Sequence, residues 1–157
     1  MDSYHVTSED ERWIARCLLL AAEAAAADEV PVGAVVVING QLVGEGRNRI
    51  EAQQSPFAHA EMEALQHAVQ QLGQKRLPLA TLYCTLEPCF LCAGALLHAR
   101  VQRVVFGARD PKFGAVRSLA TLLEDPRLNH RCTVVEGPGA DASADLLRTF
   151  FRGKRGR

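Results

Sequence analysis

The spacing of apolar positions in the first third of the chain predicts a helix followed by a β-hairpin. Ser8 followed by Glu11 is typical of a capping box, and apolar residues then recur at helical spacing up to about Ala27. The apolar run over residues 33–38 is typical of a strand buried on both faces. Asn39-Gly40 is the strongest short hairpin signal, so we expect an antiparallel return strand over residues 41–48.

The rest of the chain alternates between helical and strand-like segments. We expect helices over residues 59–72, 89–99, 118–123 and 142–151, and strands over residues 81–85, 103–107 and 133–136. The strand–helix–strand unit over residues 81–107 needs a crossover connection, so its two strands should be parallel. The sequence therefore predicts one α/β domain over residues 1–157, a three-layer α/β/α sandwich with a mixed five-stranded sheet.

Composition places the chain among globular proteins, because 48% of its residues are hydrophobic and 23% are charged. Five cysteines without a signal peptide favour the reducing cytoplasm. The apolar stretch over residues 18–27 is too short to span a membrane, so we expect no membrane partner. The formal net charge is zero, so nucleic acid would have to bind a local patch. The basic segment 152–157 is typical of a loose, solvated terminus or of an arm that contacts phosphate, and residues 1–7 are expected to form a loose leader.

Three side chains that ligate metals lie in two short motifs, His59-Ala60-Glu61 and Pro88-Cys89-Phe90-Leu91-Cys92. Cys89 and Cys92 are three residues apart, so a helix would place both thiols on one face, and a proline suits the start of that helix. The positive end of the helix dipole favours the thiolates that zinc requires. One imidazole and two thiolates suit Zn²⁺ and leave a fourth position for water, whose protons Glu61 is placed to move.

This zinc site could be catalytic or structural. His59 and Glu61 can serve one site only if a helix begins near His59, because two residues apart in mid-helix they would face different ways. Cys84 is a possible fourth ligand that would close the site, but it alternates with Leu82 and Leu86 along a strand, which favours an apolar layer. The combination H-x-E followed by P-C-x-x-C is the signature of zinc-dependent nucleobase deaminases, so we predict a catalytic, hydrolytic site.

Two further segments follow predicted strands and are candidates for substrate binding. Asn48 ends the return strand, where an asparagine is more often a turn residue than a substrate contact, and its position alone leaves both interpretations open. The polar loop over residues 108–117 follows the strand over residues 103–107, and ligands in open α/β sheets bind at such strand ends.

Several longer motifs are more discriminating than the zinc motif, which cytidine, deoxycytidylate, guanine and riboflavin-pathway deaminases share. They are Glu29-Val30-Pro31-Val32-Gly33-Ala34, Gly46-Arg47-Asn48-Arg49, Ala58-His59-Ala60-Glu61, Thr85-Leu86-Glu87-Pro88-Cys89, Arg103-Val104-Val105-Phe106-Gly107-Ala108-Arg109-Asp110, Asn129-His130 and Phe150-Phe151-Arg152. Together they resemble the bacterial tRNA-specific adenosine deaminases of the cytidine/deoxycytidylate deaminase superfamily, over roughly residues 8–152.

The resemblance implies a cytidine deaminase-like fold and the hydrolytic deamination of adenosine to inosine at the wobble position of a tRNA anticodon. It implies one Zn²⁺ per subunit, held by His59, Cys89 and Cys92, with Glu61 as the proton shuttle. It also implies a homodimer that contacts the anticodon stem-loop of tRNA with both subunits. The substrate contacts that it implies are Asn48, the backbone of Ala60, Asp110, Phe151 and Arg152.

The chain departs from the family pattern in the substrate loop. Pro111 and Phe113 stand where many relatives carry smaller residues, and Arg117 adds bulk nearby, so the details of RNA fit are not implied. Two rival functions stay open. One is a deaminase of a free base or nucleotide, and the other is a non-catalytic, zinc-stabilised RNA-binding subunit. Glu61 argues against the second, because a structural subunit needs the ligands and not the shuttle.

Overall fold

The computed structural model describes residues 4–155. Within this range the chain forms five strands, five α-helices and one short 3₁₀ helix. In chain order the elements are α1 (Ser8–Ala26), β1 (Gly33–Ile38), β2 (Gln41–Arg47), α2 (Ile50–Gln53), α3 (Ala60–Leu72), β3 (Thr81–Leu86), α4 (Phe90–His98), β4 (Arg103–Ala108), η1 (Leu122–Glu124), β5 (Thr133–Glu136) and α5 (Ala140–Arg155). None of the helices in this range is long and apolar enough to cross a lipid bilayer.

The five strands form one sheet in the order β2-β1-β3-β4-β5. β1 is antiparallel to both of its neighbours, whereas β3, β4 and β5 are parallel to one another. The predicted crossover unit, with β3 and β4 parallel on either side of α4, is thereby confirmed. Because β1 alone runs in the opposite direction, the carboxyl ends of the other four strands share one edge of the sheet.

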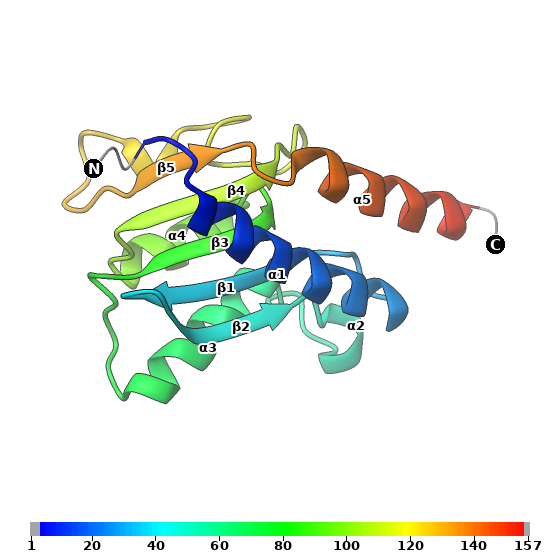
Figure 1. The fold of residues 1–157 in the computed structure, drawn as a ribbon, viewed down its shortest axis with the longest axis horizontal. Helices are drawn as coiled ribbons and strands as arrows, with labels where there is room; N and C mark the ends of the chain where they lie inside the picture. Colours follow the sequence, from blue (N-terminus) through cyan, green and yellow to red (C-terminus); the bar gives the residue numbers. More distant parts are fainter. Residues whose placement is uncertain (1–3, 156–157) are drawn as a thin grey trace.

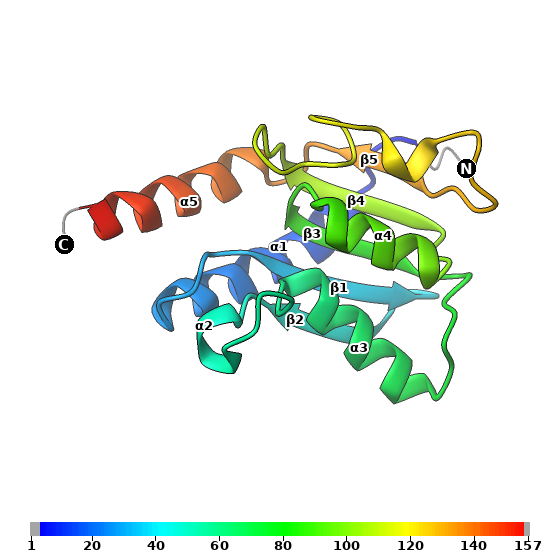
Figure 2. The ribbon, with the colours of Figure 1, turned by 180° about the vertical axis from the view of Figure 1, so that it is seen from behind.

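Helices cover both faces of the sheet. α1 and α5 lie on one face, and α3 and α4 lie on the other (Figures 1 and 2). The fold is therefore the expected three-layer α/β/α sandwich with a mixed five-stranded sheet. α5 begins at the edge where β3, β4 and β5 end, and its C-terminal half extends past the sheet in both views.

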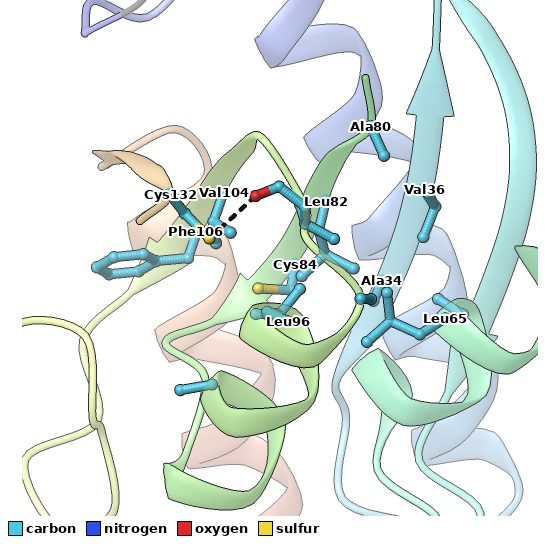
Figure 3. Packing of buried hydrophobic residues seen from close by; sticks show 14 of the residues in the cluster. Ala34, Val36, Leu65, Ala80, Leu82, Cys84, Leu96, Val104, Phe106 and Cys132 are labelled. Atoms are coloured by element: carbon cyan, nitrogen blue, oxygen red, sulfur yellow. Dashed lines mark hydrogen bonds between the residues drawn. The ribbon is translucent and has the colours of Figure 1, made fainter. Parts of the chain in front are cut away.

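Two apolar cores lie on opposite faces of the sheet. The larger one, under α3 and α4, contains Leu82 and Cys84 of β3 together with Leu96 of α4 (Figure 3). The smaller one, under α1, contains Ile14 and Tyr83. Neighbouring residues of β3 thus face opposite layers, as the pleat of a strand requires. The strand is buried on both faces, which explains its nearly continuous apolar sequence.

β2 packs closely against the first turn of α3 because Gly46 has no side chain. A Cβ atom at Gly46 would lie 2.6 Å from the carbonyl oxygen of Ala60 and 2.5 Å from Cβ of Glu63. Any larger residue would push the start of α3 away from the sheet. The close approach therefore fixes the first turn of α3 beside Asn48, which directly follows β2.

The hairpin is as predicted, since Asn39 and Gly40 both have positive φ values, 51° and 73°, as a type I′ turn requires. The helix start near Ser8 is off by one residue, because Thr7 is the N-cap of α1. The Thr7 hydroxyl accepts the Asp10 N–H, and the Asp10 carboxylate accepts the Thr7 N–H in return. The capping box is therefore formed by Thr7 and Asp10, one position before the predicted pair of Ser8 and Glu11, and both pairs fit the sequence pattern of a capping box.

Three other elements differ from the expectation. α2 was not predicted, because four residues carry too little periodicity to be noticed. The helix expected over residues 118–123 is the 3₁₀ turn η1, since the preceding segment is folded as a loop by hydrogen bonds described below. α5 runs to Arg155, four residues beyond the expected end, so the basic segment is helical at least that far. Residues 156–157 of the predicted basic arm and residues 1–3 of the predicted leader lie outside the described residues.

Candidate metal centre and active site

His59, Cys89 and Cys92 come together at the N-termini of two helices. His59 is the N-cap of α3, Cys89 is the N-cap of α4, and Cys92 follows in the first turn of α4. The His59 Nδ1 atom lies 3.5 Å from the Sγ atom of each cysteine. All three ligand atoms lie within 4.8 Å of one another. The two motifs, 30 residues apart in the sequence, thus form one candidate metal centre.

The spacing of these atoms fits a tetrahedral zinc ion. Zn–S and Zn–N bonds of about 2.3 Å and 2.0–2.1 Å, at a tetrahedral angle, place sulfur and nitrogen about 3.6 Å apart. The two Sγ–Nδ1 distances of 3.5 Å agree with this value. One nitrogen and two sulfur ligands also match the open, three-ligand arrangement of catalytic zinc sites. The residues present therefore fit the metal that the sequence predicts.

Cys84 does not belong to this group. Its side chain is buried among apolar residues of the larger core (Figure 3), and it is absent from the cluster of ligand atoms found in residues 4–155. Burial raises the pKa of the Cys84 thiol well above its ordinary value, so the thiol stays protonated. Cys84 therefore does not close the site as a fourth ligand. This agrees with the strand alternation, which predicted that Cys84 faces an apolar layer.

Glu61 lies beside the ligands in the first turn of α3 and is almost completely buried. Burial raises the pKa of its carboxyl group to about 7. The neighbouring thiol of Cys92 lowers the pKa of Cys89 to about 4, and His59 adds to this effect against the cost of burial. The same contact raises the pKa of Cys92, so Cys89 is the more readily ionised of the two thiols, and it lies beside a carboxyl group whose pKa is raised by burial.

Asn48 is fixed by the backbone of the next helix. Its Oδ1 atom accepts the N–H of Ala60 at 2.8 Å, and the side chain is buried. The amide nitrogen of Asn48 has no hydrogen-bond partner among residues 4–155, and Asn48 lines the pocket described next. The Ala60 N–H is thus already engaged by Asn48, which makes the Asn48 amide group the candidate donor for a ligand in the pocket.

A pocket of about 1000 Å³ opens over the candidate metal centre. His59, Glu61 and Cys89 lie in its wall. The other lining residues come from the carboxyl ends of β2, β3 and β4 and from α5. They are Val30, Val32, Asn48, Ile50, Leu86, Glu87, Arg109, Asp110, Pro111, Lys112, Phe113, Leu147, Phe151, Lys154 and Arg155.

The structure brings Phe151 to this pocket and leaves Arg152 outside it. Positions 147, 151, 154 and 155 recur at helical spacing and share one side of α5, and Arg152 is not among the lining residues. Lys154 and Arg155 line the pocket instead and were not predicted as site residues. The helix was expected to end at residue 151, so the sequence analysis did not place Lys154 and Arg155 on the same helix as Phe151.

Glu87 is a buried residue whose role the sequence did not reveal. Its carboxylate accepts five hydrogen bonds from the loop that follows β4. Four come from the backbone N–H groups of Asp110, Val116, Arg117 and Ser118, and one comes from the Ser118 hydroxyl. Burial by itself would raise the pKa of Glu87, but these hydrogen bonds outweigh it and lower the pKa below its ordinary value. One charged side chain thus organises the whole loop.

The same loop is joined to the metal centre. Gly114 pairs with Cys89 in an isolated β-bridge, and the Ala115 N–H donates to the Pro88 carbonyl at 2.9 Å. A side chain at Gly114 would overlap with the carboxylate of Glu87. Loop and ligand segment therefore fit together only with glycine at this position.

Comparison with known proteins agrees with this arrangement. The model of the MafB19-like deaminase family matches residues 8–155. The tRNA-specific adenosine deaminase of Bacillus subtilis is 44% identical over 92% of this chain and 90% of its own length. The chain belongs to the bacterial tRNA-specific adenosine deaminase family. The enzyme of that name from Haemophilus influenzae is 44% identical over 99% of this chain and 91% of its own length.

One solved structure of this family is described in terms of A-to-I editing by tRNA deaminases at the wobble position of transfer RNA. It shares 40% sequence identity with this chain at a TM-score of 0.83, covering 87% of this chain and 99% of its own. The guanine deaminase of Nitrosomonas europaea shares the fold at a TM-score of 0.80 and 27% identity. The fold alone thus accommodates deaminases of different substrate classes, and family membership rests on the sequence matches.

Proposed function

We propose that the protein is a zinc-dependent enzyme that hydrolyses adenosine to inosine at the wobble position of a tRNA anticodon. The observation that carries the proposal is the fit of His59, Cys89 and Cys92 to a three-ligand zinc site with the buried Glu61 beside it. The tRNA-specific names of relatives that cover nearly the whole chain support adenosine in tRNA as the substrate. We further propose a homodimer with one Zn²⁺ per subunit, as the resemblance implies, that works in the cytoplasm, as the five cysteines without a signal peptide favour.

The three ligands would hold Zn²⁺ at the bottom of the pocket. A zinc ion bound there would lower the pKa of a water molecule from about 15.7 towards roughly 7, and so would supply a hydroxide-like nucleophile near neutral pH. The N-terminal positions of Cys89 and Cys92 on α4 stabilise the thiolates that the ion requires.

Glu61 performs the proton transfers of the reaction. Its carboxylate accepts a proton from the attacking water and delivers it to the ring nitrogen next to C6 of adenine. After oxygen has added to C6, the same carboxylate takes the remaining proton of the new C6 hydroxyl group and transfers it to the amino group, so that the C6–N bond breaks and ammonia leaves. General acid–base catalysis of this kind contributes roughly 10²–10⁴-fold to the rate. The burial of Glu61 excludes bulk water that would compete for these protons.

The purine is oriented by groups in the wall of the pocket. The Asn48 amide nitrogen is a donor available to a purine acceptor, because the Ala60 N–H already holds its Oδ1. Asp110 and Phe151 line the same pocket and remain proposed contacts to the nucleotide. The basic side chains of Lys112 and Arg155 would meet the phosphates on either side of the base, whereas Lys154 is paired with Asp28 at 2.7 Å.

An anticodon loop suits a site of this kind. Deaminases take the target base out of its stack, and an unpaired base costs the least to extrude. Contacts with flanking phosphates and bases would then supply the binding energy that positions C6. Free adenosine should accordingly be a poor substrate.

The deciding experiment measures inosine at the wobble adenosine of an arginine-type anticodon stem-loop, with free adenosine and guanine as parallel substrates. We expect inosine in the stem-loop and little ammonia from either small molecule. Rapid release of ammonia from guanine, with no inosine in the RNA, would replace the proposal with a small-molecule deaminase, the function of the Nitrosomonas europaea structural relative. One zinc per subunit with no turnover on any substrate would indicate a non-catalytic RNA-binding subunit.

A further inference from the structure

Phe113 presents an exposed aromatic ring at the rim of the pocket. The residue lines the pocket and is 65% exposed. Its ring makes no aromatic contact with another residue of the described range 4–155. Single exposed apolar side chains are common on proteins, so exposure by itself indicates nothing. What distinguishes Phe113 is how firmly its backbone is held and what surrounds it.

The backbone on both sides of Phe113 is fixed. The Asp110 carboxylate accepts the N–H groups of Lys112 and Phe113 at 3.1 and 3.2 Å, which closes a tight Asx-type turn. The next residue, Gly114, donates its N–H to the Asp110 carbonyl at 2.8 Å and pairs with the zinc-ligand candidate Cys89. The backbone from which the ring extends is therefore held at a set position relative to the metal centre.

A second aromatic ring lines the same pocket from α5. Phe151 is 45% exposed and is braced from behind by Phe150, with ring centroids 5.3 Å apart in an edge-to-face arrangement. Basic side chains of the loop and of α5, Lys112 and Arg155, line the same pocket as these rings. Aromatic rings interleaved with cations are typical of surfaces that bind single-stranded nucleic acid through base stacking and phosphate contacts.

The size of the pocket also indicates more than one nucleotide. Its volume of about 1000 Å³ is at the upper end of the roughly 300–1,000 Å³ of pockets for whole drug-sized ligands. A single purine that reaches Glu61 would leave the outer part, where Phe113 lies, to be filled by another group. The next nucleobase of the same RNA strand has a flat face that suits this ring.

We propose that Phe113 is a stacking platform for a nucleobase that directly adjoins the target adenosine. This inference rests on the proposed function and specifies how that site holds its substrate. The target base enters the pocket towards Glu61, while its neighbour stays at the rim and stacks on the phenyl ring. Stacking tolerates any base, so Phe113 contributes to binding and positioning of the strand and not to the choice of base.

The test compares Phe113→Ala and Phe113→Trp with the wild type. Phe57→Ala is the matched control, because Phe57 is also a phenylalanine, is 61% exposed and does not line the pocket. Each protein is assayed for inosine formation and for RNA affinity by fluorescence anisotropy. The substrates are an anticodon stem-loop and two derivatives that carry an abasic site immediately 5′ or 3′ of the target adenosine.

We expect Phe113→Ala to lower kcat/KM and affinity on the intact stem-loop by about 5- to 150-fold, which corresponds to the roughly 1–3 kcal/mol of one base–aromatic stack. The loss should be mainly in KM. Phe113→Trp should retain wild-type values within about twofold, since its ring also stacks. On one of the two abasic substrates the wild type and Phe113→Ala should become equal, which a purely structural role of Phe113 does not predict.

Two results would overturn the inference: equal activity and affinity of Phe113→Ala and the wild type on the intact RNA, or an unchanged difference between them on both abasic substrates. Failure of the proposed function looks different. In that case the wild type forms no inosine in any RNA, while the anisotropy measurement still reports whether Phe113 stacks on a neighbouring base.

Discussion

The metal centre and the rim of the pocket are built in different ways. His59, Glu61, Cys89 and Cys92 lie in two short motifs, each at the N-terminus of a helix that packs on the sheet. The rim consists of the loop after β4 and one side of α5, which are far apart in the sequence and partly exposed. The centre is set by local sequence, whereas the rim depends on a distant side chain, Glu87.

This difference separates chemistry from recognition. The neighbouring elements that fix the centre are buried and apolar, so its geometry tolerates little change. The rim carries exposed aromatic and basic groups, and substitutions there can alter which RNA fits without affecting the reaction. We therefore expect variants of the centre to abolish turnover and variants of the rim to change binding by smaller factors.

The largest effect should come from the ligands. Cys89→Ala or Cys92→Ala removes one of three protein ligands, so we expect loss of bound zinc and no measurable inosine. Cys84→Ala is the control, because Cys84 is as buried as Cys92 but lies in the apolar core outside the ligand group. Zinc content by atomic spectroscopy, measured with the activity, decides the matter. Full zinc occupancy in either ligand variant would show that the assignment is wrong.

Glu61→Gln should separate metal binding from proton transfer within the centre. The amide fills the same buried space but cannot carry protons, so we expect zinc to stay bound while kcat falls by roughly 10²–10⁴-fold or more. Glu63→Gln, two residues further along α3, bonds to Gln53 at the surface and should keep wild-type turnover. A Glu61→Gln enzyme with wild-type kcat would falsify the proposed shuttle.

Glu87→Gln tests whether the rim depends on one distant residue. Gln has one acceptor oxygen in place of two, so donors of the loop lose their partner and the loop that carries Asp110 and Phe113 should loosen. We expect KM for the stem-loop to rise by about 10-fold or more, since each lost charged hydrogen bond costs roughly 1.5–3 kcal/mol. Zinc content should be unchanged. A normal KM in a folded variant would mean that the loop is held by its other contacts.

The pH dependence of stability provides a second test of Glu87. Its pKa is lower in the folded protein than its ordinary value, so the folded state favours the charged carboxylate. The resulting stabilisation is fully present above the unfolded-state pKa of about 4.5 and is lost as the pH falls through the folded-state value. Denaturant unfolding should show a smaller drop in stability below about pH 4.5 for Glu87→Gln than for the wild type. Equal drops would contradict the role of its charge.

The smallest effect should come from single basic residues of α5. Arg155 lines the pocket and Arg152 does not. Arg155→Ala should therefore weaken RNA binding a few-fold and reduce the slope of log affinity against log salt by about 1. Arg152→Ala should leave both nearly unchanged, contrary to the expectation from resemblance. If Arg152→Ala has the larger effect, α5 meets RNA with the other side of the helix.

The difference between centre and rim also explains what could be predicted. The grouping of His59, Cys89 and Cys92 with Glu61 beside them could be predicted because ligand chemistry, helix starts and the three-residue cysteine spacing all act over a few residues. The interpretation of Cys84 as a core residue rested on strand alternation and is confirmed by its burial. Glu87 was quoted only as part of a motif. Nothing within a few residues of it indicated that its partners lie 23–31 positions further along the chain.

The sequence by itself determined the layers of this protein and the residues of its candidate metal centre. Periodicity of apolar residues is a local property, so it predicted all five strands, the crossover unit and the mixed sheet. Tertiary structure decided which groups share the pocket. Four strands that point the same way bring the segments after β2, β3, β4 and β5 to one edge, and only this arrangement places Asn48, Glu87, Phe113 and Phe151 around one site. Such contacts depend on packing between distant segments, which no local pattern records.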